Sequence, residues 1–436
     1  GVPGTVAGFD LALKRFGTRS WRELAAPAVR LAEKGFSLSW AMTDSLKKRK
    51  SEWKKYPSSA RVFLKNDTIP YEPGDVWKQP DLARTLKRLQ RNGRDGFYKG
   101  ETARLIVADM KKNGGLVTEE DLARYEAKER SPVHGTYRGY GIYSMSPPSA
   151  GGTVLIEMLN ILEGFDLAQY GHNSAQYLHL LVETMRRAYA DRARYLGDPD
   201  FNPNMPIEML LSKSYAAELR SSISLDKKSV SDPIRFYDKV ESTETTHYSI
   251  MDAEGNAVVV TYTLEDSYGS RIVADGLGFL YNNEMGDFNP QPGRTDTSGM
   301  IGTDPNIIEP EKRMLSSMTP TIITRNGKPY VLIGSPGGRT ITNTVLQVVL
   351  NIIDFNMNIS EAISAPRMHH QWLPDVIKIE KYGTTSDSRR LLETRGHAVK
   401  TVNGHGIAMG IMIDPKSGLR LGAADPRSPD GAAVGY

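Results

Sequence analysis

The first half of the chain has the hydrophobic spacing of α-helices. A helical pattern runs from position 3 to about position 35, and shorter helical pieces follow over 82–89 and 102–111. An apolar helix is indicated over 153–162, and apolar residues recur at steps of three or four over 174–196. Thr118 is followed by three acidic residues, which is typical of a helix start because a hydroxyl can cap the first N–H groups. We predict a mostly helical first half with one strand over 137–145.

From position 245 onward, the pattern changes to strands separated by turns. Alternation over 245–252 and 256–264, around Ala253-Glu254-Gly255, predicts a β-hairpin. Asn326-Gly327 predicts a second hairpin turn between strands over 320–324 and 330–333. Further strands are predicted over 271–274, 279–282, 376–380 and 407–413, and helices over 340–354, 360–365 and 387–395. We predict an α+β fold in which two sheets are covered by helices on both sides.

The first hairpin places two threonines opposite each other. If the loop holds three residues, Asp252 faces Asn256, and counting outward along the ladder sets Thr245 opposite Thr263. A threonine at a free N-terminus can use its own α-amine as the base that activates its hydroxyl, and a second hydroxyl can orient the first. Threonine pairs also simply stabilise sheets, so the hairpin alone does not establish catalysis.

The segment before this hairpin lacks the pattern of a helix or a strand. Positions 221–244 are polar and without apolar period, which indicates a surface linker where the chain can be cut. His247 lies on the same strand face as Thr245, and we interpret it as packed or hydrogen-bonded rather than as a proton shuttle. Adjacent residues do not share a face, so His369 and His370 are also given structural roles.

Composition excludes several classes of protein. The 55 basic and 51 acidic residues leave a net charge of +4, which is too balanced to indicate a nucleic-acid partner. The absence of cysteine excludes disulfides and thiolate metal sites. No apolar run approaches the ~20 residues of a membrane span. We therefore predict no nucleic-acid partner and no membrane span. A bound metal or cofactor is not expected either, although composition alone excludes only thiolate metal sites.

The start of the sequence suggests that residues are missing before it. Gly1-Val2-Pro3-Gly4 has no initiator methionine and reads as the interior of a domain, so we expect a truncated N-terminus and an unobserved targeting peptide. The lack of cysteine fits an exported protein. The expected location is periplasmic or extracellular.

Three further motifs carry groups that can bind charged ligands. Residues 334–338, Gly-Ser-Pro-Gly-Gly, lie between a predicted strand and a predicted helix, where N–H groups attract anionic oxygens; the segment lacks the lysine of a P-loop, and it is also consistent with a plain tight turn. Glu284 and Asp287 could hold an ammonium group, bind a metal, or be solvated. The hydroxyls of Ser316 and Ser317 could donate to a carboxylate.

With these motifs in view, the sequence resembles the γ-glutamyltransferase (γ-glutamyltranspeptidase) family of N-terminal-nucleophile hydrolases along essentially its whole length. The motifs that carry the resemblance are Val2-Pro3-Gly4-Thr5 and residues 147–152, 245–249, 282–288, 315–318 and 334–338, followed by Ala365-Pro366-Arg367 with His369-His370, and Asp425-Pro426-Arg427. Their order and separations are specific to the family.

The resemblance implies a precursor that cuts itself between Glu244 and Thr245. The large-subunit portion, 1–244, and the small-subunit portion, 245–436, would stay together in one four-layer αββα sandwich of two antiparallel sheets covered by helices. Thr245 would attack a γ-glutamyl amide such as glutathione and pass the acyl group to water, an amino acid or a peptide. No cofactor is implied.

The resemblance also implies a role for each residue of the motifs. Thr263 would support the nucleophile, and the N–H groups of Gly337 and Gly338 would form the oxyanion hole. Glu284 and Asp287 would hold the substrate's α-ammonium group. Ser316 and Ser317 would hold its α-carboxylate.

Three departures from the family pattern bear on substrate choice. The family's substrate-binding arginine lies upstream of Gly1, Glu265 stands where an asparagine is common near the substrate, and Ser298 stands in the lid segment where several transferases have an aromatic residue. We expect Ser298 to favour hydrolysis over transfer, unless another lid residue such as Met300 supplies the cover. Because of Glu265, a cephalosporin-acylase-like amidohydrolase remains an alternative, and so does an inert truncated form that only binds.

Overall fold

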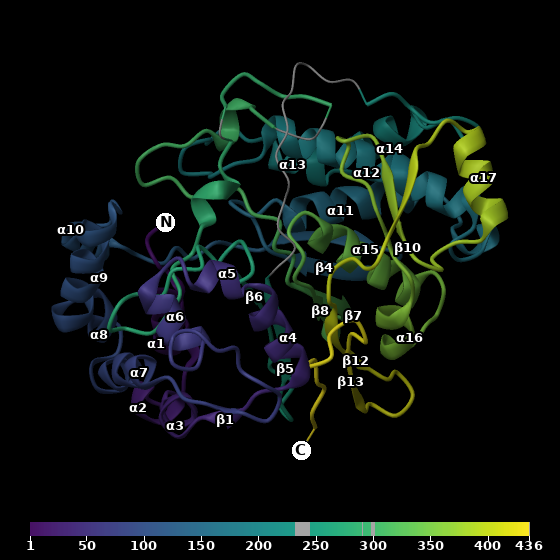
Figure 1. Ribbon diagram of the computed structural model, residues 1–436. Helices are drawn as coiled ribbons and strands as arrows, with labels where there is room; N and C mark the ends of the chain where they lie inside the picture. Colours follow the sequence, from purple (N-terminus) through teal and green to yellow (C-terminus); the bar gives the residue numbers. More distant parts are fainter. Residues whose placement is uncertain (232–244, 290, 298–300, 436) are drawn as a thin grey trace. The chain divides into compact units, whose positions relative to one another are not determined.

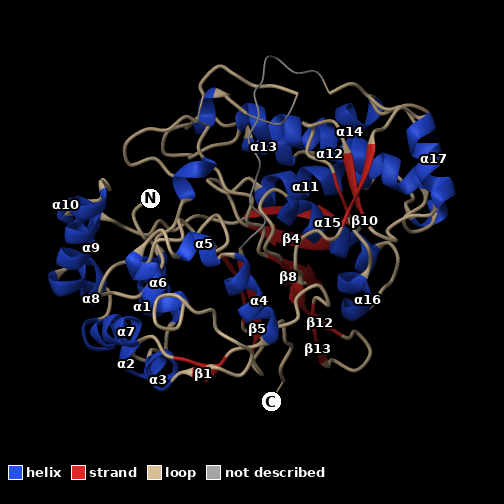
Figure 2. Ribbon diagram, viewed as in Figure 1, coloured by secondary structure: helices blue, strands red, loops and turns tan. Residues whose placement is uncertain are grey.

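The computed structural model describes residues 1–231, 245–289, 291–297 and 301–435, and the chain divides into two units (Figure 1). The first unit comprises Gly1–Arg130 and Asp266–Glu284, and the second comprises Ser131–Glu265 and Met285–Tyr436. Helices and strands are mixed, as Figure 2 shows.

The first unit is mostly helical, as predicted. Its helices are α1 Thr5–Phe16, α2 Trp21–Leu24, α3 Ala26–Lys34, α4 Trp40–Lys48, α5 Lys50–Trp53, α6 Pro57–Phe63, α7 Pro80–Asn92, α8 Asp95–Tyr98, α9 Gly100–Asn113 and α10 Glu119–Arg124. A short antiparallel pair, β1 Phe36–Ser37 with β2 Val76–Trp77, joins them. Thr118 caps α10 through a reciprocal capping box with Asp121, which confirms the predicted helix start.

The segment 266–284 corrects the prediction of strands over 271–274 and 279–282. It forms a tight loop that contains an isolated β-bridge between Val273 and Leu280, closed by backbone hydrogen bonds such as the one from the Ala274 N–H to the Phe279 carbonyl oxygen at 2.8 Å. Its apolar residues pack into the hydrophobic core of the helical unit, where Leu277 is buried. The Leu277 carbonyl oxygen accepts a hydrogen bond from the Thr85 hydroxyl at 2.8 Å. The apolar residues of this segment therefore reflect burial of a loop, which the sequence pattern alone cannot separate from a short strand.

The second unit is built on a six-stranded antiparallel sheet. In sheet order its strands are β13 Arg420–Ala424, β12 Met409–Ile413, β8 Lys328–Gly334, β7 Thr321–Arg325, β4 Tyr140–Ser144 and β3 Val133–Tyr137. The single strand predicted over 137–145 is a hairpin, because Arg138 and Gly139 both adopt positive φ and reverse the chain. β4 pairs with β7 across a large sequence separation, with Ser144 facing Thr321.

The sheet lies between a helical layer and a second β layer. Helix α11 Gly151–Leu162 packs on β3 and β4, α15 Thr340–Ile353 packs on β8, and the long α12 Ala175–Tyr195 packs on α11. The hairpin of β5 Thr246–Met251 and β6 Ala257–Tyr262 packs against β8 and β12. The central strand β8 is buried from Tyr330 to Gly334, as expected for a strand covered on both faces.

The rest of the second unit completes this packing. Helices α13 Ile207–Leu211, α14 Lys213–Ser221, α16 Ile359–Ser364 and α17 Ser386–Thr394 surround the core. β10 Ile377–Glu380 pairs antiparallel with β9 Met368–His369 and parallel with β11 Val399–Val402. The parallel pair departs from the purely antiparallel prediction because α17 provides the crossover between its strands.

Candidate active site

The β5–β6 hairpin has the predicted register. Thr246 faces Tyr262, and the Asp252 N–H donates to the Asn256 carbonyl oxygen at 3.1 Å. This register sets Thr245 opposite Thr263, and the Thr245 hydroxyl donates to the Thr263 hydroxyl oxygen at 3.5 Å. Glu244, on the other side of the predicted cleavage point, lies outside the described residues, as do Ser298 and Met300.

Thr263 is held by the backbone that follows it. Its hydroxyl oxygen accepts a hydrogen bond from the Glu265 N–H at 2.8 Å. Glu265 has a φ of 76°, a left-handed conformation that a non-glycine residue adopts only when its surroundings impose it. The turn after β6 thus fixes the orientation of the hydroxyl that contacts Thr245.

The same turn brings the Glu265 side chain to the predicted ammonium-binding segment. A Cβ atom added to Gly286 would lie 3.4 Å from both carboxylate oxygens of Glu265. Gly286 belongs to the 3₁₀ turn Glu284–Asp287. The carbonyl oxygen of Asp287 accepts from the Asn306 side-chain amide at 2.7 Å, which fixes the end of this turn. Glu284 belongs to the first unit, and its role stays a prediction.

The motif at 147–152 is hydrogen-bonded to the backbone of the segment that carries Ser316 and Ser317. The Ser316 N–H donates to the Pro148 carbonyl oxygen at 3.0 Å, and the Ala150 N–H donates to the Ser316 carbonyl oxygen at 2.9 Å. The Ser149 hydroxyl adds a bond to the Met318 carbonyl oxygen at 2.7 Å. The proline-rich motif therefore fixes the backbone on which both predicted carboxylate-binding hydroxyls stand.

Arg192 and Tyr189 on α12 contact the predicted site residues or their neighbours. These contacts were not predicted from the sequence. Arg192 donates from Nη2 to the Ser317 hydroxyl oxygen at 3.1 Å, and Tyr189 donates from its hydroxyl to the Arg339 carbonyl oxygen at 2.5 Å. Both belong to the helix predicted over 174–196, in which they are spaced one turn apart. That spacing on a buried face was the available signal, but it does not show which partners the helix meets.

The glycine turn after β8 leads directly into helix α15. Gly337 and Gly338 have φ angles of 135° and 54°, which favour glycine. The Gly337 carbonyl oxygen accepts from both the N–H of Thr340, at 3.0 Å, and its hydroxyl, at 2.7 Å. The turn thus precedes a helix N-terminus, where the aligned peptide dipoles favour negative charge.

His247 has the predicted packed role. It is buried, and its ring nitrogens are hydrogen-bonded to the hydroxyls of Thr261 at 2.7 Å and Ser249 at 3.1 Å. Burial lowers the pKa of His247 to about 4, so the ring is neutral at physiological pH. A Cβ atom on Gly334 would lie 2.1 Å from its Cε1 atom, so the ring packs directly on the end of β8.

His369 and His370 are likewise structural. Both are fully buried and hydrogen-bonded: His369 to the side chains of Asn343 at 2.8 Å and Gln371 at 2.6 Å, and His370 to Asp375 at 3.2 Å.

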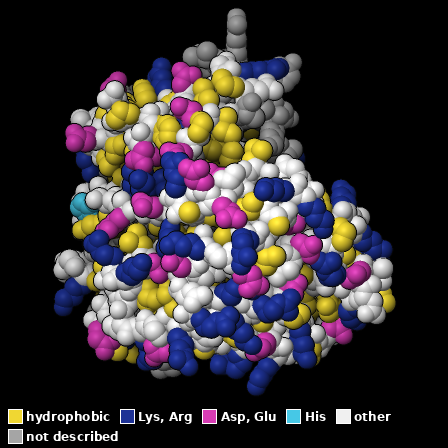
Figure 3. Space-filling model, turned by 90° about the vertical axis from the view of Figure 1, so that its left-hand side faces the viewer, with side chains coloured by type: hydrophobic (Ala, Val, Ile, Leu, Met, Phe, Trp, Pro, Cys, Tyr) yellow, Lys and Arg dark blue, Asp and Glu magenta, His cyan; other side chains and the backbone are white. Residues whose placement is uncertain are grey.

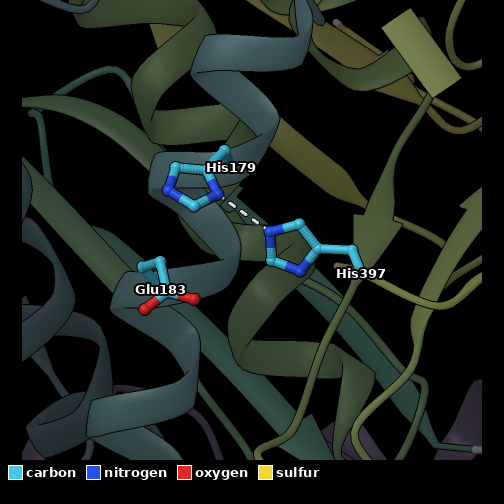
Figure 4. Close-up of side chains that lie close together, drawn as sticks. All are labelled: His179, Glu183 and His397. Atoms are coloured by element: carbon cyan, nitrogen blue, oxygen red, sulfur yellow. Dashed lines mark hydrogen bonds between the residues drawn. The ribbon is translucent and has the colours of Figure 1, made fainter. Parts of the chain in front are cut away.

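A third histidine cluster joins distant parts of the second unit (Figure 4). His179 and Glu183 lie one turn apart on α12, and His397 faces them from the loop between α17 and β11; their ligand atoms lie within 4.8 Å of one another. The Glu183 oxygens accept from the Ser229 N–H at 3.1 Å and from Arg187 at 2.9 Å. Because Glu183 is already bound in this way, we interpret the cluster as a hydrogen-bonded network.

The distribution of surface charge and the lengths of the helices concern the predictions about nucleic acid and membrane. On the face shown in Figure 3, lysine and arginine side chains are interspersed with aspartate and glutamate. Within the part of the chain that the structure describes, we find no helix of sufficient length and apolar character for a membrane crossing.

The Thr245–Thr263 pair lies on a β-hairpin that packs against a helix-covered sheet. This arrangement is typical of the class of N-terminal-nucleophile hydrolases, in which a threonine at a free N-terminus uses its own α-amine as the base. The family model for gamma-glutamyltranspeptidase matches residues 1–435, so the chain belongs to the gamma-glutamyltranspeptidase family. A relative from Escherichia coli (strain K12), named glutathione hydrolase proenzyme, is 46% identical over 438 residues, covering 100% of this chain and 75% of the relative.

Solved structures agree with this assignment. A cephalosporin acylase from Bacillus halodurans superposes with a TM-score of 0.86 at 27% identity, covering 100% of this chain and 78% of that one. The gamma-glutamyltranspeptidase of Helicobacter pylori gives a TM-score of 0.52 at 46% identity, covering 52% of this chain and 65% of that one. The predicted family, fold class and type of enzyme are therefore confirmed.

Proposed function

We propose that this chain is a self-cleaving γ-glutamyltransferase and glutathione hydrolase whose nucleophile is Thr245. The observation that carries the proposal is the hydrogen bond from the Thr245 hydroxyl to the Thr263 hydroxyl, in the register that the sequence predicts. The relatives named glutathione hydrolase support the choice of substrate.

In self-cleavage the Thr245 hydroxyl acts as the nucleophile, and the cut itself produces the free α-amine. The Thr245 hydroxyl attacks the carbonyl carbon of Glu244, the peptide C–N bond breaks, and an ester forms while the nitrogen gains a proton. Water then hydrolyses the ester and leaves a free α-amine on Thr245. That amine is the base that a threonine nucleophile needs in every later turnover.

Turnover follows the same chemistry on a γ-glutamyl amide. The hydroxyl attacks the γ-carbonyl carbon, the α-amine accepts its proton, and the N–H groups of Gly337 and Gly338 are assigned to the oxyanion. The leaving amine takes the proton as the C–N bond breaks. Water, an amino acid or a peptide then attacks the ester and releases the acyl group.

Substrate binding is assigned to opposite charges at the two ends of the glutamyl group. Asp287, Glu284 and Glu265 would hold the α-ammonium group, and Ser316 and Ser317 would hold the α-carboxylate. The proximity of the Glu265 carboxylate to Gly286 supports the first assignment. A glutaryl group lacks the ammonium group, so it could not form the charge-assisted hydrogen bonds assigned to these carboxylates, which favours γ-glutamyl donors.

The two portions of the chain, 1–244 and 245–436, are proposed to remain associated after the cut. The six-stranded sheet supports this, because β3 and β4 precede the cleavage point and β7, β8, β12 and β13 follow it. The β4–β7 pairing thus joins the two portions by backbone hydrogen bonds. A periplasmic or extracellular location is also proposed.

The test is to incubate the full-length protein and follow it on a denaturing gel. Two bands that elute together on size exclusion, with the smaller one beginning at Thr245, are expected together with release of glutamate from glutathione. Thr245→Ala should remain a single chain without activity. A small fragment that begins at another residue would overturn the assignment of the nucleophile.

A further inference from the structure

The hydroxyl oxygens of Ser316 and Ser317 each accept a hydrogen bond from a group that can only donate. The Ser316 hydroxyl oxygen accepts from the Met318 N–H at 3.1 Å, and the Ser317 hydroxyl oxygen accepts from Arg192 at 3.1 Å. A hydroxyl has one hydrogen and two lone pairs, and neither an N–H group nor a guanidinium can accept that hydrogen. Each hydroxyl is therefore turned so that its hydrogen is directed to another acceptor.

The surroundings of Ser317 stabilise this orientation of its hydroxyl group. Ser317 is 9% exposed and Arg192 is 8% exposed, so their hydrogen bond is largely shielded from water. The Ser317 carbonyl oxygen also accepts from the Thr319 hydroxyl at 2.8 Å, which fixes the backbone. A charged donor makes the stronger kind of hydrogen bond, and a guanidinium with five donors cannot reverse its role.

We propose that Arg192 is a positioning residue for the donor's α-carboxylate, acting through the Ser317 hydroxyl. Its guanidinium donates to the Ser317 hydroxyl oxygen and so orients that hydroxyl as a donor to the carboxylate. The inference rests on the proposed function, because it assumes that Ser317 meets the α-carboxylate of a γ-glutamyl group.

The position of Arg192 on α12 shows why this helix serves the site. Tyr189, one turn earlier, holds the Arg339 carbonyl oxygen next to the glycine turn. A single buried helix therefore supports the carboxylate-binding serine and the turn assigned to the oxyanion. The two contacts predict separate effects: loss of the Arg192 contact weakens binding of the donor, whereas loss of the Tyr189 contact slows the chemical step.

The test is a double-mutant cycle between Arg192 and Ser317, measured as kcat and KM for a γ-glutamyl anilide. Arg192→Met is expected to raise KM at least tenfold with kcat within about threefold, and Arg192→Lys to raise KM less, because lysine keeps the charge but not the planar fork. In the Ser317→Ala background, Arg192→Met should change KM by less than about twofold, because the hydroxyl through which it acts is gone.

The matched control is Arg194→Met, which removes an exposed arginine from the same helix, where it lies over the Tyr195 ring. Its KM should stay within about twofold of the parent. Self-cleavage on a denaturing gel reports folding of every variant, and Arg192→Lys covers the case in which Arg192→Met does not fold.

Four outcomes would overturn the inference. Equal KM increases from Arg192→Met with and without Ser317 would show that Arg192 acts elsewhere, and a loss confined to kcat would show that it does not serve donor binding. If the parent turns over the anilide but KM is unchanged in both Arg192 variants, this inference alone fails. If the parent has no γ-glutamyl activity at all, the proposed function fails with it.

Discussion

The His247 ring fills the space that a side chain on Gly334 would occupy, with Cε1 only 2.1 Å from the position of a Cβ atom. His247 lies two residues after Thr245, and Gly334 lies three residues before Gly337. This contact therefore ties the strand that carries the nucleophile to the strand that leads to the glycine turn. The absence of a side chain at position 334 is a condition for the site.

We expect Gly334→Ala to destabilise the protein and reduce activity, because either the His247 ring or β8 must move. Overpacking of this kind typically costs about 1–3 kcal/mol. Urea unfolding measures the loss, and the rate of γ-glutamyl anilide hydrolysis measures its effect on the site. Gly8→Ala is the matched control, because a Cβ atom there meets nothing within 4 Å in helix α1. Equal stability of Gly334→Ala and the parent would contradict the packing argument.

Asp287→Asn is expected to weaken donor binding much more than it slows self-cleavage. Its carboxylate is assigned to the ligand's ammonium group, whereas the scissile peptide carries no such group. Removing one partner of a close charge pair typically costs about 2–5 kcal/mol. The measurement is KM for a γ-glutamyl anilide beside the time course of cleavage on a gel. A KM within about twofold of the parent would show that Asp287 is not a ligand.

The histidine pair on α12 and the loop before β11 predicts acid sensitivity. His179 Nε2 bonds to the Ser224 carbonyl oxygen at 2.7 Å, so this nitrogen donates and Nδ1 accepts from His397 Nε2 at 2.8 Å. His179 is thus held in one neutral tautomer, with its proton on Nε2. Burial lowers the pKa of His397 to about 3 and also lowers the pKa of His179. Nearby Arg186 and Arg395 act in the same direction, and Glu183 opposes them.

The direction in which pH changes the free energy of unfolding follows from which state binds more protons. As pH falls below about 6.5, the unfolded chain protonates these histidines while the folded chain does not, so the free energy of unfolding decreases by up to about 1.4 kcal/mol per pH unit for each of them. Urea unfolding at pH 7, 6, 5 and 4 measures the slope, which His397→Gln should reduce. His134→Gln changes an exposed histidine and serves as the control. An unchanged slope in His397→Gln would exclude the pair as its source.

How far the sequence leads depends on how local each feature is. The Thr245–Thr263 pairing was predictable because a short loop fixes the register of a hairpin. The pairing of Ser144 with Thr321 was not, because it joins segments far apart in the chain, and the same holds for the contact of Arg192 with Ser317. The strands predicted over 271–274 and 279–282 were wrong because the apolar residues of this segment fill a helical core, and burial of a loop can give the same run of apolar residues as a strand.

The last prediction concerns Glu265, whose carboxylate lies beside Gly286 in the turn that carries Asp287. A carboxylate there attracts the α-ammonium group of a γ-glutamyl donor but repels a donor that bears only a carboxylate. Glu265→Gln removes this charge and keeps a polar side chain of the same length and shape. We expect KM for a γ-glutamyl anilide to rise about three- to tenfold at low salt, with a smaller rise at high salt because ions screen partly exposed charges. KM for the matching glutaryl anilide, which lacks only the ammonium group, should fall. Opposite changes for the two donors would show that Glu265 selects between γ-glutamyl transfer and acylase-type hydrolysis, whereas changes in the same direction would mean that its charge does not reach the donor's α-ammonium group.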